Sequence, residues 1–194
     1  MIRQVKGEVG VEVTDILKEE HQAIERVTTS LEIAANRLSR GDEVYLRFFF
    51  GTSYFIRSFT DGYHHMKEET ILFPALIGNG LSNESGPVPL MLAEHEQARK
   101  LSLRMRQVTE RFQSGDENVR NLVVQTALGY VRLLRQHMQK ENNLLYPIAD
   151  KVIPVGQQQQ MLEAFKLYEH DDTGEDVHEK YTSLADRLVN ESMR

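Results

Sequence analysis

The strongest constraint on the fold is the way glycine and proline divide the chain into a few long segments. They gather, together with serine and aspartate, at Gly41-Asp42, in residues 78–89, at Ser114-Gly115-Asp116 and at Pro154-Val155-Gly156. Because such clusters mark turns and interrupt regular structure, the segments between them predict long helices. The expected helices cover residues 13–39, 44–77, 88–113 and 117–150. No stretch alternates convincingly with a period of two, so strands are not expected. The pattern predicts an all-α protein, an up-and-down four-helix bundle.

Residues 151–194 follow the last expected bundle helix and form an extension. Within them, apolar residues recur at steps of four and three, which is typical of one buried face of a helix. These residues are Val177, Tyr181, Leu184 and Leu188. We therefore expect an additional C-terminal helix, packed on the bundle or on a partner subunit. The expected division is a bundle over residues 1–150 and a helical extension over residues 151–194.

The charge and composition of the 194-residue chain exclude several classes of function. The formal charge is −6 and the isoelectric point about 5.7, so neither nucleic acid nor an anionic membrane surface is the expected partner. The chain has no cysteine, which excludes disulfides, thiolate catalysis and cysteine-ligated iron–sulfur clusters. The N-terminus lacks the apolar segment of a signal peptide, and the most apolar stretch, residues 45–56, is too short to span a bilayer. We expect a cytoplasmic protein.

Histidines lie on the apolar faces of the expected helices. Residues on one face recur at steps of three and four, and such a series includes His21 in the first helix, His95 in the third and His137 in the fourth. In the fourth helix Glu141 follows His137 by one turn. A single core imidazole would be accounted for by ordinary hydrogen bonding in the core. Its repetition in several helices favours a shared metal site.

The second helix offers two pairs in which a glutamate follows a histidine by four residues. One pair is His64 with Glu68, and the other is His65 with Glu69. The series of residues that precedes His64 by whole turns is the more apolar one, so we expect His64 and Glu68 to point inward. We expect His65 and Glu69 on a solvated face or around the site. A buried carboxylate is costly unless its charge is compensated, and carboxylates that span two metal ions would have that compensation.

Four short motifs carry these histidines and glutamates. They are Glu20-His21-Gln-Ala-Ile24, His64-His-Met-Lys-Glu68-Glu-Thr-Ile-Leu72-Phe73-Pro74, Met91-Leu-Ala-Glu94-His95-Glu and His137-Met-Gln-Lys-Glu141-Asn-Asn-Leu-Leu-Tyr146-Pro147. Over about residues 14–150 the chain resembles the hemerythrin-like family, also called HHE cation-binding domains. The resemblance implies a bundle around a non-haem di-iron centre, two iron ions with a bridging oxo or hydroxo group. It implies imidazole ligands at His21, His64, His95 and His137 and bridging carboxylates at Glu68 and Glu141.

The chain departs from the family pattern at two positions. Hemerythrin has a further histidine one turn before the third-helix histidine, where this chain has Met91, and an aspartate where this chain has Glu141. If two imidazoles, two bridging carboxylate oxygens and one bridging solvent oxygen bind each iron, one octahedral position stays open on both irons. Such positions permit binding of O2, NO or peroxide. Met91 is interpreted as core filler rather than a weak thioether ligand, and Tyr54 and Tyr63 as packing residues.

Three functions are open at this point. The leading hypothesis is a di-iron protein that binds O2, NO or peroxide for sensing, storage or detoxification. The second is a peroxidase-like or NO-processing enzyme, and the third is a non-redox metal-binding module that docks a partner through residues 151–194. A ferritin-like oxygenase is less favoured, because the one clear Glu-x-x-His motif lies in the extension, at Glu175 and His178. A homodimer or a protein partner is a further expectation.

Overall fold

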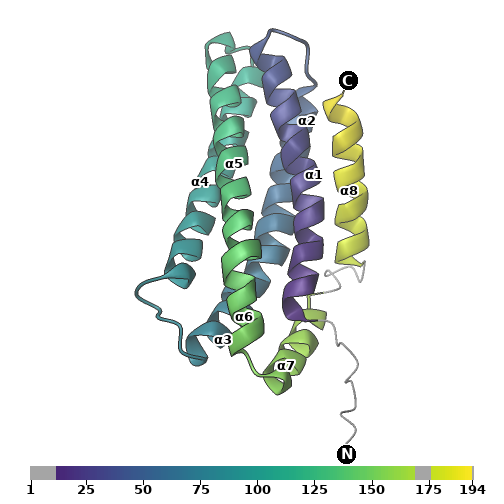
Figure 1. The fold of residues 1–194 in the computed structure, drawn as a ribbon. Coiled ribbons are helices and arrows are strands. Elements are labelled where there is room, and N and C mark those ends of the chain that lie inside the picture. The colour runs from purple at the N-terminus through teal and green to yellow at the C-terminus, as the bar shows by residue number, and fades with distance from the viewer. Residues whose placement is uncertain (1–11, 169–175, 194) are drawn as a thin grey trace, which may run out of the picture.

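A bundle of four long helical segments, running up and down, forms the centre of the computed structural model, which describes residues 12–168 and 176–193 (Figure 1). The first segment is α1, Val13–Ser39, and the third is α4, Pro87–Gln113. The second runs through α2, Leu46–Phe55, η1, Ile56–His65, η2, Glu68–Leu72, and α3, Phe73–Gly78. The fourth runs through η3, Glu117–Val119, α5, Arg120–Lys140, η4, Glu141–Leu145, and α6, Tyr146–Val152. The expected all-α bundle is confirmed. Glu175, like the rest of 169–175 and like 1–11, lies outside the described residues.

Two glycines define the ends of the single-helix segments. Gly41 follows α1 with a φ of 85°, and Gly115 follows α4 with a φ of 94°. Glycine adopts this left-handed conformation without the steric cost that a side chain brings. In both places the N–H groups of the glycine and of the next residue bond back to carbonyls of the last helical turn, at 3.0 to 3.2 Å. The helices therefore end sharply, and short loops return the chain in the opposite direction.

The second and fourth segments depart from α-helical geometry where the histidine–glutamate motifs lie. Glu68 begins the π-helical turn η2 and Glu141 begins η4, and Pro74 and Pro147 follow shortly after these turns. Proline cannot donate an N–H to the carbonyl one turn earlier, and its ring crowds that carbonyl. A wider turn before the proline accommodates both effects, and π turns of this kind are frequent at functional sites. The α-helical periodicity that assigns faces in the sequence therefore does not hold here.

The apolar core consists of two clusters with a polar layer between them. Along α1, Leu17 belongs to the smaller cluster and Ile24 to the larger one, and His21 lies between them. The same alternation occurs along α4, where Met91 and Ala98 flank His95 in the sequence. The burial of apolar side chains on both sides holds the four segments together. The polar layer is consequently fixed inside the bundle rather than at its surface.

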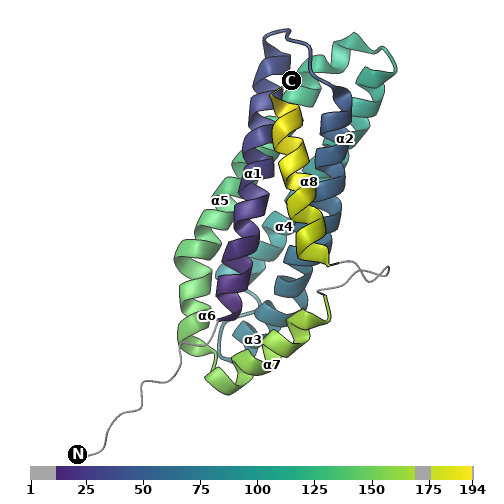
Figure 2. The ribbon, with the colours of Figure 1, turned by 90° about the vertical axis from the view of Figure 1, so that its right-hand side faces the viewer.

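The described part of the extension contains two helices rather than the one that the sequence predicts. α8, Val177–Ser192, runs along α1 and α2 (Figure 2). A Cβ on Gly51 of α2 would lie 2.9 Å from Leu188, so a glycine is needed for this close approach. α7, Val155–Lys166, covers the lower end of the bundle, where Met161 and Phe165 join the smaller cluster. Both helices pack on the bundle of the same chain.

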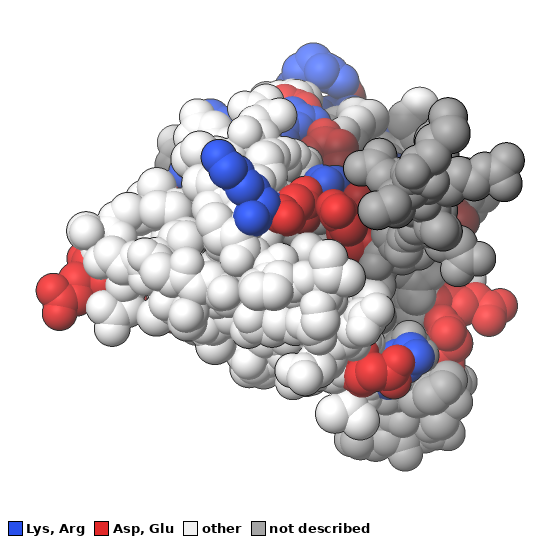
Figure 3. Space-filling view, turned by 60° about the horizontal axis from the view of Figure 1, so that its bottom comes forward, with Lys and Arg blue, Asp and Glu red and all other residues white. Residues whose placement is uncertain are grey.

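The end of the molecule that contains α3, α6 and α7 has few charged side chains. Residues 73–83, 144–149 and 152–162 include no lysine, arginine, aspartate or glutamate. Figure 3, seen from this end, shows a broad uncharged face. Within the described ranges, no helix has the length and apolar character needed to cross a membrane.

Candidate metal centre

The polar layer between the two apolar clusters contains every ligand residue that the sequence predicts. These side chains come from all four helical segments, and none is more than 4% exposed. They are His21 of α1, His64 of η1, Glu68 of η2, His95 of α4, His137 of α5 and Glu141 of η4. The fold therefore brings together residues that are up to 120 positions apart in the sequence, as the numbers 21 and 141 show.

The four imidazoles form two pairs through their Nε2 atoms. The Nε2 atoms of His21 and His64 lie 3.0 Å apart, and those of His95 and His137 also lie 3.0 Å apart. Nε2 is the ring nitrogen farther from the backbone, so all four side chains reach toward the middle of the bundle. Each pair could supply two nitrogen ligands to one cation.

The two carboxylates lie between the two imidazole pairs. Glu68 Oε2 is 3.4 Å from His95 Nε2 and 3.8 Å from His64 Nε2. Glu141 Oε2 is 3.3 Å from His21 Nε2, and Glu141 Oε1 is 2.9 Å from His137 Nε2. Glu141 Oε1 is also 3.8 Å from His95 Nε2, so each carboxylate reaches at least one imidazole of each pair. This arrangement suits carboxylates that bridge two neighbouring ions.

The other ring nitrogen of each histidine, Nδ1, contacts a side-chain oxygen. The four contacts are His21 to Asn142 at 3.0 Å, His64 to Glu20 at 2.8 Å, His95 to Glu69 at 2.7 Å and His137 to Glu94 at 3.0 Å. An Nδ1–H that donates to such an oxygen leaves a lone pair on Nε2. Histidines that bind metals almost always have this outer hydrogen bond, which fixes the tautomer and the ring orientation.

Two lysines complete this outer layer. Lys67, 1% exposed, forms an ion pair with Glu20, and Lys140 forms one with Glu94. These pairs hold the glutamates in position and compensate their charge. Burial raises the pKa of Glu20, but the hydrogen bond to His64 and then Lys67 hold it below the ordinary value. The hydrogen bond to His137 and then Lys140 do the same for the pKa of Glu94. Buried charges are tolerated when they are paired in this way.

The inner carboxylates are not satisfied in the same way. Glu68 Oε2 and both oxygens of Glu141 are buried and form no hydrogen bond of good geometry with any described residue, although imidazole nitrogens lie nearby. Orphaned buried carboxylate oxygens call for a cation. Imidazole and carboxylate donors suit iron, zinc or manganese. The residues that are present therefore fit a metal centre.

The pKa values in this layer also favour positive charge at the imidazoles. Burial lowers the pKa of His95, but the carboxylates of Glu141, Glu68 and Glu69 around its ring outweigh burial and raise the pKa to about 11. The pKa of His137 is raised to about 9, again against burial, chiefly by Glu141. Metal ions that bind imidazole replace its proton. A cation would satisfy the same oxygens that now favour the protonated rings.

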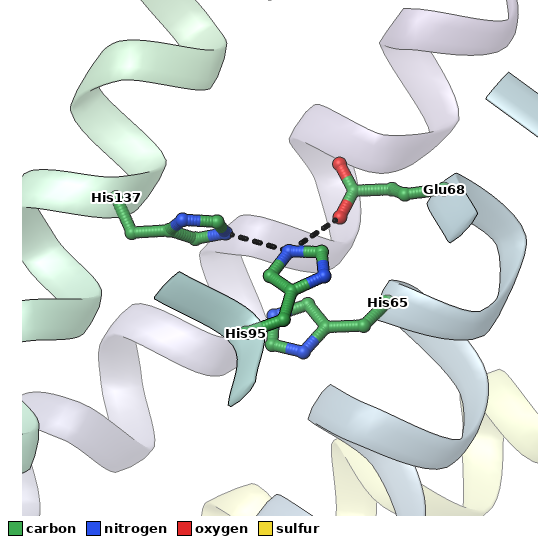
Figure 4. A group of neighbouring side chains, drawn as sticks. All are labelled: His65, Glu68, His95 and His137. Atoms are coloured by element: carbon green, nitrogen blue, oxygen red, sulfur yellow. Dashed lines mark hydrogen bonds and ion pairs between the residues drawn. The ribbon is translucent and has the colours of Figure 1, made fainter. Parts of the chain in front are cut away.

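His65 lies around the site, which is one of the two places expected for it from the sequence. It is not solvated: it is 2% exposed and stacks on His95, with ring centroids 3.7 Å apart and planes at 11°. Figure 4 shows the His65 ring beside that of His95, with Glu68 and His137 close by. Ligand atoms of these four residues lie within 4.8 Å of one another. Because η1 is a π-helix, both His64 and His65 face the interior. Glu69 lies around the site, at His95 Nδ1.

Tyr146 is a further residue of the centre for which the sequence suggested no role. Its hydroxyl donates a hydrogen bond to Glu68 Oε1 at 2.7 Å, and its ring stacks on His21 with centroids 5.6 Å apart. Burial and the neighbouring carboxylates raise its pKa well above the ordinary value, so the phenol keeps its proton and acts as a donor. The signal in the sequence is the Tyr146-Pro147 pair, which corresponds to Phe73-Pro74 after the other glutamate.

The remaining residues that the sequence singled out lie in packing positions. Met91 is 1% exposed and belongs to the smaller apolar cluster. Tyr54 is 43% exposed, with its ring near Tyr181, and Tyr63 stacks on Phe59. These contacts agree with the interpretation of all three as packing residues.

A helical bundle with a buried layer of histidine and glutamate is typical of metal-binding bundle proteins, and comparison with known proteins identifies the family. The hemerythrin HHE cation binding domain matches residues 12–149, and the chain belongs to this family. It is also similar to proteins of Mycobacterium bovis and Mycobacterium tuberculosis that are described as uncharacterized. Each is 26% identical over 182 residues, which cover 94% of this chain and 69% of the relative. No solved structure gives a significant match.

Proposed function

We propose that the chain holds a non-haem di-iron centre and binds O2, NO or peroxide there, for sensing, storage or detoxification. One observation carries this proposal: Glu68 and Glu141 each lie within 4 Å of at least one imidazole from both Nε2 pairs. Two imidazoles on each side and two shared carboxylates make a ligand set for two adjacent ions rather than for one. His21 and His64 would hold one ion, and His95 and His137 the other.

Bound iron would supply a redox-active Lewis acid with open positions for a small ligand. The side chains of this chain do the rest. The oxygens of Glu20, Glu69, Glu94 and Asn142 fix the imidazole rings. The hydroxyl of Tyr146 orients Glu68. The apolar clusters on both sides exclude bulk water. This favours reversible binding of the small ligand over its side reactions with water and protons.

The place of Met91 supports open positions on both ions. Met91 lies one turn before His95, where hemerythrin has a further imidazole, and its side chain is buried in the apolar cluster. A thioether is a soft and weak ligand for iron, so we propose that it fills no coordination position. His65 is the nearest additional imidazole, and we place it outside the six ligands.

The first experiment counts the metal. The purified chain is loaded anaerobically with Fe(II), freed of excess iron and analysed by inductively coupled plasma mass spectrometry. We expect two irons per chain, and the same number for His178→Ala, which changes an exposed histidine on α8. A folded chain that takes up no iron would overturn the proposal.

The second experiment separates binding from catalysis. NO is titrated into the reduced iron-loaded chain and azide into the oxidised iron-loaded chain. Peroxide decay is followed in the same preparations. Stoichiometric binding without sustained turnover supports a binding function. Steady-state turnover of peroxide or NO would instead support the enzyme. Met91→His should lower the number of exogenous ligands bound per chain, because an imidazole would close one open position.

A further inference from the structure

A cavity of about 370 Å³ opens between η1 and α4, beside the candidate metal centre. None of the six proposed ligands lines it, but His65 does. Its walls are mostly apolar, with Ile56, Ala98 and Leu103 among the lining side chains. Pockets of this size, largely apolar with a few polar groups, are typical of small-molecule sites. The cavity is therefore large enough for an organic molecule, well beyond a diatomic ligand.

The charged residues that line the cavity are mainly arginines. Arg57, Arg99 and Arg106 line it, against the single carboxylate of Asp61, so arginines outnumber carboxylates among the lining residues. Arg99 is already paired with Asp61 at 2.7 Å and with Glu69 at 2.6 Å, and Arg106 with Glu110 at 3.0 Å. Arg57 is exposed, and no described residue forms an ion pair with it. An anion at the rim would meet an unpaired guanidinium.

Buried polar atoms without partners line the interior of the same cavity. His65 Nδ1 lies 3.5 Å from Asp61 Oδ1. His65 Nδ1 and Nε2, the Tyr130 hydroxyl and Ser53 Oγ are buried and form no hydrogen bond of good geometry with a described residue. Each of these atoms can bond to a polar group of a ligand. The two ring nitrogens of His65 can bond to such a group as donor or acceptor. Such orphaned groups in a native protein call for a partner.

We propose that this cavity is a second binding site, which takes a small organic carboxylate with an apolar body and a hydrogen-bonding group at its far end. The carboxylate pairs with Arg57 at the exposed rim. The apolar body lies against Ile56 and Ala98, and the far group bonds to the interior atoms at Tyr130 or His65. The site is defined by residues outside the proposed ligand set, so it does not depend on which metal the chain holds.

Isothermal titration calorimetry on the full chain tests this site with three matched probes. The first, 4-hydroxyphenylacetate, has the carboxylate, the apolar ring and the far hydroxyl. Its amide lacks the charge, and phenylacetate lacks the hydroxyl. Because charge-assisted hydrogen bonds are the stronger ones, we expect the amide to bind about tenfold or more weakly than the acid. Phenylacetate should also bind more weakly than 4-hydroxyphenylacetate, but by a smaller factor than the amide. Equal binding of the acid and its amide, or no binding of either, would overturn the proposal.

Two pairs of variants locate the binding. Arg57→Gln should weaken 4-hydroxyphenylacetate about tenfold or more, whereas Arg104→Gln, an exposed arginine of α4 that does not line the cavity, should leave it unchanged. Ala98→Leu should fill the cavity and abolish binding, whereas Gln97→Leu on the exposed side of the same turn should not. Arg57 is exposed, so its variant is expected to fold. Binding that persists in Arg57→Gln contradicts the site. Calorimetry measures binding of the probe directly and needs no reaction at iron. Failure of this site can therefore be distinguished from failure of iron uptake.

Discussion

The two halves of the candidate centre follow the same plan. In the half made by α1 and the second segment, Glu20 precedes His21 and contacts His64. In the half made by α4 and the fourth segment, the corresponding residues are Glu94, His95 and His137. Each glutamate also pairs with the lysine three residues after the histidine that it holds. Two helix pairs thus supply the same set of contacts to the centre.

The halves differ at three positions that touch the imidazoles. His95 Nδ1 bonds to the carboxylate of Glu69, whereas His21 Nδ1 bonds to the neutral amide of Asn142. His95 stacks on Phe73, whereas His21 stacks on Tyr146, whose hydroxyl reaches Glu68. Finally, His65 stands where the other half has Met138. The repeated residues form the polar layer that would hold the metal, and the differing residues make its two sides chemically unequal. The following predictions test that division.

The largest effect is expected from the shared carboxylates. Glu68→Ala and Glu141→Ala should each reduce the metal content from two ions per chain to fewer than one, because each carboxylate serves both sides. Metal analysis after gel filtration measures this, with the exposed Glu110→Ala as the control. If either variant keeps one tightly bound ion on a defined side, the two halves are independent sites and the carboxylates do not bridge.

The next effect separates the two neighbouring histidines of η1. His64→Ala should lose the ion on the His21 side, because the Nε2 pair is broken there, while His65→Ala should keep both ions. The measurement is iron content together with the optical spectrum of the loaded chain. Should His65→Ala empty the His95 side while His64→Ala stays loaded, His65 is a ligand and the proposed set is wrong by one residue.

The sequence predicts most of the fold and which histidines and glutamates lie together in the buried polar layer, because both depend on helical periodicity. His21 and His95 lie in uninterrupted α-helices, where steps of three and four identify the buried face. For His65 the α-helical faces left two alternatives, a solvated face or a place around the site, because π-helical turns alter that periodicity. The structure places it around the site. Glu20 and Glu94 could not be assigned from their own helices, since each acts on a histidine of another segment. The signal that could have found them is the repeated combination of Glu-His with His-x-x-Lys-Glu.

A smaller effect is expected from exchanging the oxygens that hold His95 and His21. Glu69→Gln makes the His95 side resemble the other half. It should lower the affinity for one of the two ions by about tenfold, the lower end of what outer hydrogen bonds contribute to metal affinity. Asn142→Asp should raise the affinity for the ion on the His21 side, because a carboxylate at Nδ1 makes the imidazole a more basic metal ligand. Competition with a chelator gives both affinities. Unchanged affinities in both variants would mean that Glu69 and Asn142 do not make the sides unequal.

The smallest effect concerns Tyr146, the hydroxyl-bearing member of the pair that it forms with Phe73. Tyr146→Phe makes the two halves alike and removes the donor to Glu68 Oε1, leaving a buried carboxylate oxygen without its hydrogen bond. The metal-free chain should lose about 1–3 kcal/mol in the free energy of unfolding, measured by urea denaturation. The matched control is Tyr130→Phe, since the buried Tyr130 hydroxyl forms no hydrogen bond of good geometry with a described residue and its removal should cost little. In the metal-loaded chain the loss of stability in Tyr146→Phe should be smaller, because the bound ions would satisfy the Glu68 carboxylate. Equal losses in the two tyrosine variants would show that the hydroxyl of Tyr146 is not what distinguishes the two halves.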